Sequence, residues 1–138
     1  MKYYAVIDTN VLVSAMLKLN SLPGKIISLV DSGAIVPLLH GEIMREYREV
    51  LTRPKFHFDS RLIQLVVGGM ERRGIYVDSQ TLKIDLPDPK DRIFYEVTRE
   101  KRKSGEAWLV TGNIRHFPVM PFVVTPRQML QVMGIESQ

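Results

Sequence analysis

The stretch YYAVIDTNVLVSAML, residues 3–17, decides the fold class of this chain. Residues 3–7 are aromatic or apolar almost throughout, which is typical of a strand buried on both faces of a parallel sheet. The run stops at one acid, Asp8, and apolar residues then resume at helical spacing over residues 10–19. A carboxylate therefore stands where a buried strand turns into a helix, and its position there needs an explanation.

Strands and helices alternate along the rest of the chain. Further short apolar strands are expected at residues 34–39, 75–78, 107–111 and 122–124. Helices are expected at residues 10–19, 23–33, 42–51, 60–70, 89–101 and 126–133. This alternation predicts an α/β fold with a mainly parallel central sheet and helices on both faces. No linker is long enough to divide the chain, so we expect residues 1–138 to form a single domain.

Local signals refine these elements. Pro37 lies in the second strand, and its missing N–H favours an edge of the sheet or a strand end. Ser60 is a possible N-cap for the helix that follows it. Apolar residues between 62 and 70 suit either the core or a dimer interface. The helix at 42–51 is clearly amphipathic, with a buried stripe of Ile43, Tyr47, Val50 and Leu51.

Composition excludes several classes of function. The chain has 138 residues, 45% of them hydrophobic, and no cysteine, which excludes disulfides, thiolate zinc sites and cysteine nucleophiles. The apolar runs are far shorter than a membrane span, and no signal peptide follows Met1, so we expect a soluble cytoplasmic protein without membrane contact. The net charge of +4 is compatible with a nucleic-acid partner without requiring one.

Two polar residues follow predicted strands at their carboxyl ends, where open parallel sheets bind ligands. Asp8 directly follows the first strand, and Asn113 follows the strand at 107–111. Asp8 could be only a helix cap, but Thr9 or Asn10 could cap the helix without a carboxylate. We therefore favour a functional role for Asp8 and expect Asn10 to cap.

Other acids lie on helices. At 100° per residue, Glu46 lies nearest the apolar stripe of its helix, whereas Glu42 and Glu49 point towards water. Glu46 could therefore reach a site at the edge of the core, although most helical glutamates only pair with arginines on the surface. Asp88, followed by proline, is expected to be a structural N-cap, and Asp91 is expected to face inward.

Acids from separate segments predict a cation site if the fold brings them together. Carboxylates that lie close together repel one another unless a cation neutralises them. Oxygen ligands without cysteine or paired histidine select Mg²⁺ or Mn²⁺, and such ions at a basic surface suggest phosphate-ester chemistry. The candidates are Asp8, Glu46 and Asp91, with Asn113 as a possible fourth member.

Four motifs resemble those of one nuclease family, in order and spacing. They are VIDTNVLVSAML, EIMREYREVLTRPKF, LPDPKDRIFYEV and WLVTGNIRHFP, and together they cover nearly the whole chain. The chain is similar to PIN-domain ribonucleases, and most closely to toxin components of VapBC-like toxin–antitoxin systems. The resemblance implies a three-layer α/β/α fold and Mg²⁺- or Mn²⁺-dependent cleavage of single-stranded RNA. It also implies a cognate antitoxin and, in many members, a homodimer.

The resemblance also implies roles for individual residues. The family's first three acids match Asp8, Glu46 and Asp91, and the fourth, commonly aspartate, matches Asn113. Asparagine keeps an oxygen donor but lacks a charge, so the number of metals stays open, while Asn113 would position a ligand. Residues that would line the cleft or support it are Thr9, Asp88 and Thr111.

Some features allow more than one interpretation. His116 is the histidine near the expected site, and we favour packing of the loop over general-base catalysis. A basic segment at 99–103 could contact RNA phosphates or could be a solvated helix end. The alternative to an enzyme is a non-catalytic PIN-like module that binds RNA or protein. A haloacid-dehalogenase-like phosphatase would need a second aspartate at position 10, and a response-regulator receiver would need a lysine after a late strand; both are missing.

Overall fold

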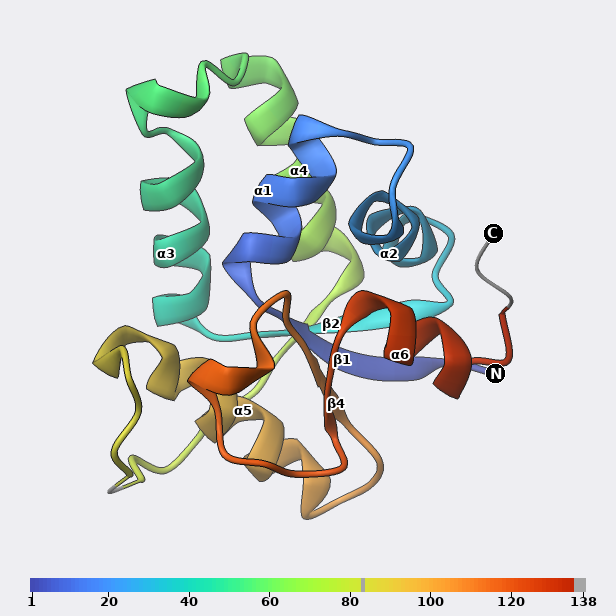
Figure 1. The fold of residues 1–138 in the computed structure, drawn as a ribbon, viewed down its shortest axis with the longest axis vertical. Coiled ribbons are helices and arrows are strands. Elements are labelled where there is room, and N and C mark those ends of the chain that lie inside the picture. The colour runs from blue at the N-terminus through green and yellow to red at the C-terminus, as the bar shows by residue number, and fades with distance from the viewer. Residues whose placement is uncertain (83, 136–138) are drawn as a thin grey trace.

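A computed structural model gives the structure of the protein and describes residues 1–82 and 84–135. Its central sheet has five parallel strands in the order β3-β2-β1-β4-β5, with helices on both faces, which confirms the three-layer α/β/α fold (Figure 1). The strands are β1 (Tyr3–Ile7), β2 (Ile35–Leu39), β3 (Ile75–Tyr76), β4 (Trp108–Val110) and β5 (Val123–Val124). The α-helices are α1 (Thr9–Leu17), α2 (Leu22–Asp31), α3 (Gly41–Leu51), α4 (Ser60–Arg73), α5 (Arg92–Arg102) and α6 (Pro126–Val132).

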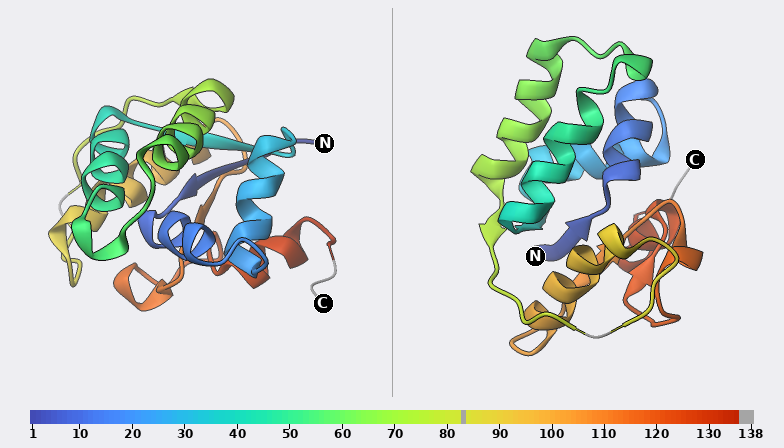
Figure 2. Two further views of the ribbon diagram at one scale, coloured as in Figure 1. Left: turned by 90° about the horizontal axis from the view of Figure 1, so that it is seen from above. Right: turned by 90° about the vertical axis from the view of Figure 1, so that its left-hand side faces the viewer.

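The helices form two unequal layers. Helices α1 to α4 pack on one another above the sheet, and α5 lies on the opposite face against β1, β2 and β4 (Figures 1 and 2). Helix α6 contacts α2, β4 and β5. This arrangement brings the beginnings of α1, α3 and α5 to the edge of the sheet where β1 and β4 end (Figure 1).

The prediction for Pro37 is wrong. Strand β2 is not an edge strand, because it lies between β1 and β3. The ladder with β3 starts only at Leu38, which pairs with Ile75, and the carbonyl of Pro37 points towards Gly74 just before β3 begins. Proline is tolerated at position 37 because the backbone N–H that it lacks would face the β3 side of the strand. The ladder with β3 has not yet begun at that residue, so no hydrogen bond is lost.

Several predicted helix ends also differ from the structure. Asp59, rather than Ser60, caps α4, since its Oδ1 accepts a hydrogen bond from the backbone N of Arg61 at 2.7 Å. The helix expected at residues 89–101 begins as a 3₁₀ turn, Pro89–Asp91, and becomes α-helical only from Arg92. Another 3₁₀ turn, Ile114–His116, lies in a segment where no helix was expected.

The core joins both faces of the sheet. The rings of Tyr47 from α3 and Phe94 from α5 are fully buried, with centroids 6.4 Å apart. Met44 is buried and Val50 only half-buried, so the stripe on α3 lies slightly further round than predicted. In α4 the residues Ile63, Val67 and Met70 are buried in the core. Within the described residues, no helix is long and apolar enough to cross a membrane.

A close backbone approach at Gly24 gives a first testable prediction. A Cβ atom at Gly24 in α2 would lie 1.9 Å from the carbonyl oxygen of Leu19. We expect Gly24→Ala to lower the free energy of unfolding by about 1–3 kcal/mol, because overpacking forces the backbone to shift. Urea unfolding would measure this, with Gly41→Ala as the control, since nothing lies within 4 Å of a Cβ there. Equal effects of the two substitutions would contradict the prediction.

Candidate active site

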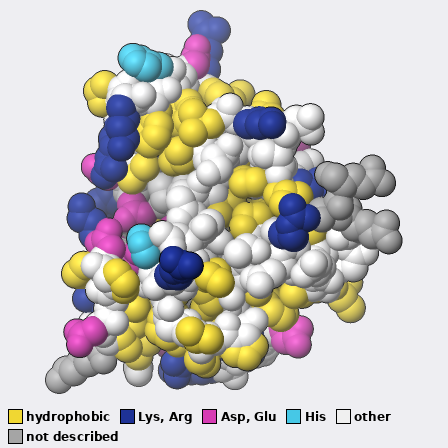
Figure 3. Space-filling view, viewed as in Figure 1, with side chains coloured by type: hydrophobic (Ala, Val, Ile, Leu, Met, Phe, Trp, Pro, Cys, Tyr) yellow, Lys and Arg dark blue, Asp and Glu magenta, His cyan; other side chains and the backbone are white. Residues whose placement is uncertain are grey.

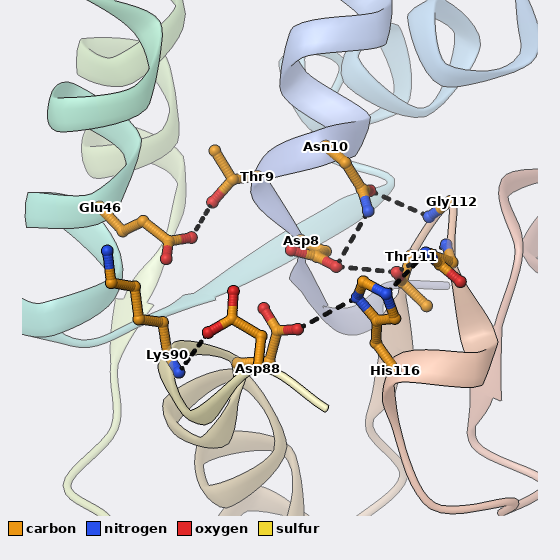
Figure 4. Close-up of polar contacts among 11 residues, drawn as sticks. Asp8, Thr9, Asn10, Glu46, Asp88, Lys90, Thr111, Gly112 and His116 are labelled. Atoms are coloured by element: carbon orange, nitrogen blue, oxygen red, sulfur yellow. Dashed lines mark hydrogen bonds and ion pairs between the residues drawn. The ribbon is translucent and has the colours of Figure 1, made fainter. Parts of the chain in front are cut away.

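Asp8 lies at the carboxyl edge of the sheet and is joined there to the end of the neighbouring strand. Its backbone N donates to the carbonyl oxygen of Val110 at the end of β4, at 2.9 Å. Its Oδ2 accepts hydrogen bonds from Thr111 Oγ1 at 2.8 Å and from Asn10 Nδ2 at 3.2 Å (Figure 4). Asp8 is the N-cap residue of α1, but its side chain makes no capping hydrogen bond. The carboxylate therefore does not cap the helix, and the functional role suggested by the sequence stays a prediction.

Burial changes the ionisation of Asp8. The side chain is only 5% exposed, and burial raises its pKa to about 7. The hydrogen bond from Thr111 opposes this rise, whereas the charges of Asp91 and Glu46 add to it. Within the described residues, hydrogen bonds rather than a cationic side chain oppose the rise in the pKa of Asp8.

The expectation that Asn10 caps α1 is wrong, and Thr9, the other residue that could have capped it, does not do so either. Thr9 Oγ1 donates to Glu46 Oε2 at 2.5 Å, so its hydroxyl joins α1 to α3. Asn10 Oδ1 accepts from the backbone N of Gly112 at 3.0 Å, while its Nδ2 donates to Asp8 (Figure 4). Both side chains bind partners brought close by the fold, and this is why helix-capping statistics misassigned them.

Glu46 reaches the same region from α3. It is half-buried, whereas Glu42 and Glu49 are exposed, as predicted. The neighbouring Tyr47 donates from its hydroxyl to the carbonyl oxygen of Ile7, the last residue of β1, and so fixes α3 at the strand end. Burial raises the pKa of Glu46, the hydrogen bond from Thr9 opposes the rise, and the charge of Asp91 adds to it.

The two aspartates before α5 have different surroundings. Asp88 is exposed, and its Oδ1 accepts from the backbone N of Lys90 at 3.0 Å, so it is the predicted cap. Asp91 is 9% exposed and faces inward, also as predicted. Burial raises the pKa of Asp91, the charge of Asp88 adds to the rise, and His116 opposes it.

Asn113 and His116 form a pair that the sequence did not reveal. Asn113 Nδ2 lies 2.9 Å from His116 Nε2, and His116 Nδ1 lies 3.4 Å from Asp91 Oδ2. The backbone N of Asn113 donates to Thr111 Oγ1 at 3.0 Å. His116 thus contacts the candidate residues Asp91 and Asn113 and is more than a packing residue of the loop, and the amide of Asn113 is engaged by its ring. Asn113 and His116 are three residues apart, which is one turn of a 3₁₀ helix. This spacing was the signal in the sequence that could have predicted their contact.

The donors fit a hard divalent cation. They are oxygen atoms of three carboxylates, and mutual repulsion contributes to the raised pKa values of Asp8 and Glu46. Figure 3 shows acidic side chains gathered beside a histidine between α3 and the start of α5, with Lys and Arg around them. Within residues 1–82 and 84–135, no three His, Asp or Glu side chains already form a metal-binding group.

The basic segment at 99–103 lies away from these acids. Helix α5 starts beside Asp91, and the rise of about 1.5 Å per residue puts its last turn roughly 16 Å from the site. Arg102 donates to the carbonyl oxygen of Ala107, and Lys103 pairs with Glu100. Contact of this segment with RNA phosphates stays a prediction.

The fold and the acidic edge define a class of protein. The chain forms a parallel α/β/α sandwich with carboxylates directly after β1, on α3 and just before α5 at one edge of the sheet. The sequence matches the PIN domain family over residues 4–115, and the chain belongs to that family. The matched range includes Asp8, Glu46, Asp91 and Asn113. PIN domains are generally nucleases and typically use divalent metals. No curated protein matches the chain.

Proposed function

We propose that this protein is a metal-dependent endoribonuclease that cleaves single-stranded RNA, and that it is the toxin of a toxin–antitoxin pair. The observation that carries the proposal is the shared edge of Asp8, Glu46 and Asp91. The pKa of each carboxyl is raised, first by burial, and the charge of Asp91 adds to the rise for the other two. Such a set gains stability from a divalent cation, and PIN-family membership supports nuclease chemistry.

The residues of the chain have distinct parts in this mechanism. Asp8, Glu46 and Asp91 would hold Mg²⁺ or Mn²⁺, directly or through water. When bound, the ion supplies a Lewis acid for phosphodiester hydrolysis and an ionised water nucleophile at neutral pH. Thr111 fixes the orientation of the Asp8 carboxylate, and Thr9 fixes that of Glu46. The charge of +4 favours approach of the RNA backbone.

Partners of the proposed toxin follow from the resemblance. We propose that a cognate antitoxin protein binds it, that it acts as a homodimer and that it works in the cytoplasm. Light scattering on the purified protein measures the oligomeric state: twice the monomer mass is expected, and monomer mass would contradict the homodimer.

Incubation of purified protein with matched single-stranded RNA, double-stranded RNA and single-stranded DNA tests the proposed activity. With Mn²⁺ we expect cleavage of the single-stranded RNA, and we expect a chelator to stop it. Cleavage that persists in the chelator would contradict the metal dependence, and equal cleavage of all three substrates would contradict the substrate class. A folded protein that cuts none of them would favour the non-catalytic binding module.

Expression in cells tests the toxin role separately. We expect the wild-type chain to arrest growth and the Asp91→Asn variant to leave growth unaffected, because the variant lacks one proposed cation ligand. Arrest by both chains at equal expression would mean that the nuclease site is not its cause.

A further inference from the structure

Asn113, His116 and Asp91 form a continuous chain of polar contacts at the acidic edge. The amide Nδ2 of Asn113 meets one ring nitrogen of His116, and the other ring nitrogen faces the Asp91 carboxylate. The 3₁₀ turn Ile114–His116 sets this geometry, because the backbone N of His116 donates to the carbonyl oxygen of Asn113 at 3.1 Å. Three residues are thus placed so that one imidazole links the end of β4 to the start of α5.

The orientation of the Asn113 amide indicates which tautomer of the ring is present. Its Nδ2 faces the ring and can only donate a hydrogen bond, so the matching tautomer carries no proton on His116 Nε2. The single proton of the neutral ring is then on Nδ1, which lies 3.4 Å from Asp91 Oδ2. The pair therefore presents an N–H donor to the carboxylate of Asp91.

We propose that His116 is a positioning residue that orients the Asp91 carboxylate, and that Asn113 acts only through His116. The inference rests on the proposed function, since the orientation matters if Asp91 holds a cation. It also assigns a different role to Asn113 from the one expected from sequence, where the amide positions a ligand itself. The site then has a hydrogen-bond donor, His116, behind its third acid, and Asn113, which matches the family's fourth acid, acts on that donor.

Packing does not explain His116 equally well. Its side chain is 42% exposed, so little apolar area would be lost by replacing it. The adjacent Phe117 is buried and already anchors this segment in the core. Partners behind a metal ligand fix the orientation of that ligand, and their loss typically lowers metal affinity by about 10–100-fold.

Matched substitutions separate the two edges of the imidazole. His116→Asn keeps an N–H donor near the position of Nδ1, whereas His116→Gln keeps one near Nε2, and His116→Phe removes both. We expect the affinity for Mn²⁺, measured by calorimetry, to stay within about 3-fold of wild type in His116→Asn and to fall by about 10-fold or more in the other two. A packing role would instead leave His116→Phe the least affected and would overturn the proposal.

A double-variant cycle tests the role of Asn113. Asn113→Ala should lower Mn²⁺ affinity in the wild-type chain but cause no further loss when combined with His116→Phe, because Asn113 would then have nothing to act through. Equal losses in both backgrounds would mean that Asn113 acts on its own, and this would overturn the second half of the proposal.

Nitrogen NMR of the imidazole rings gives a result that does not depend on activity. At pH 8 we expect His116 in wild-type protein to be protonated at Nδ1, and we expect a mixture of tautomers in Asn113→Ala. A ring protonated at Nε2 in the wild type would overturn the inference. If the wild type shows the Nδ1–H form but neither binds Mn²⁺ nor cuts RNA, the proposed function fails while the orienting contact stands.

Discussion

Replacing Asp8 with asparagine should stabilise the cation-free protein at pH 8. The Asp8 carboxyl has a pKa of about 7 in the folded protein against an ordinary value of 3.8, so its ionisation opposes folding by up to about 4 kcal/mol. Asparagine removes this penalty and keeps an oxygen that can accept from Thr111 and Asn10. Its NH₂ group would carry no charge to repel Asp91 or Glu46.

The sign of this effect fixes its pH dependence. Below pH 3.8 the carboxyl is protonated in the folded and unfolded chains alike, and it contributes nothing. As the pH rises from about 4 to about 7 the unfolded chain loses its proton first, so wild-type protein loses stability over this range. The advantage of Asp8→Asn should therefore grow between these values and level off above pH 7.

Urea unfolding at pH 4, 6 and 8 in the presence of a chelator measures this difference. Asp85→Asn is the matched control, because Asp85 is exposed and its neutralisation should change stability very little at any of the three values. An Asp8→Asn variant no more stable than wild type at pH 8 would show that the buried carboxylate is already compensated within the fold.

The second large effect concerns cleavage itself. Asp91→Asn and Glu46→Gln should each lower the rate of single-stranded RNA cleavage by at least about 100-fold. Loss of a residue that only supports a metal ligand lowers activity by up to about 100-fold, and loss of a ligand itself should cost at least as much. Each substitution keeps the size of the side chain and removes one charge from the proposed cation site. The measurement is the initial rate of cleavage at a fixed Mn²⁺ concentration.

Each of these acids has an exposed control nearby in the chain. Asp85 precedes the same helix as Asp91, and Glu49 lies on the same helix as Glu46. Asp85→Asn and Glu49→Gln should leave the rate within about 3-fold of wild type, in keeping with surface changes worth less than about 1 kcal/mol. If all four variants lost activity equally, general charge rather than a specific site would be responsible.

Much of the fold could be predicted because its signals are local. The apolar run of β1, the alternation of strands with helices and the amphipathic stripe of α3 all depend on residues close together in the chain. The inward positions of Glu46 and Asp91 followed from helical spacing alone. Pro37 was misplaced because the start of β3 opposite Leu38 is a property of the sheet rather than of the strand.

The side-chain partners within the site could not be predicted. Thr9 binds Glu46 across 37 residues, and Asn10 binds the backbone of Gly112 across 102 residues. Local capping preferences assign both residues to α1, and tertiary contacts override those preferences. His116 was underestimated for the same reason, because its ring reaches Asp91 from a different segment.

Calorimetric titration of Mn²⁺ into wild-type protein and Asp8→Asn at pH 8 tests most directly whether the acidic edge is a cation site. We expect saturable binding to the wild type and an affinity at least about 10-fold lower in the variant, which would remain folded. Equal affinities, or no binding to a folded wild type, would contradict the assignment of Asp8, Glu46 and Asp91 to a common divalent cation.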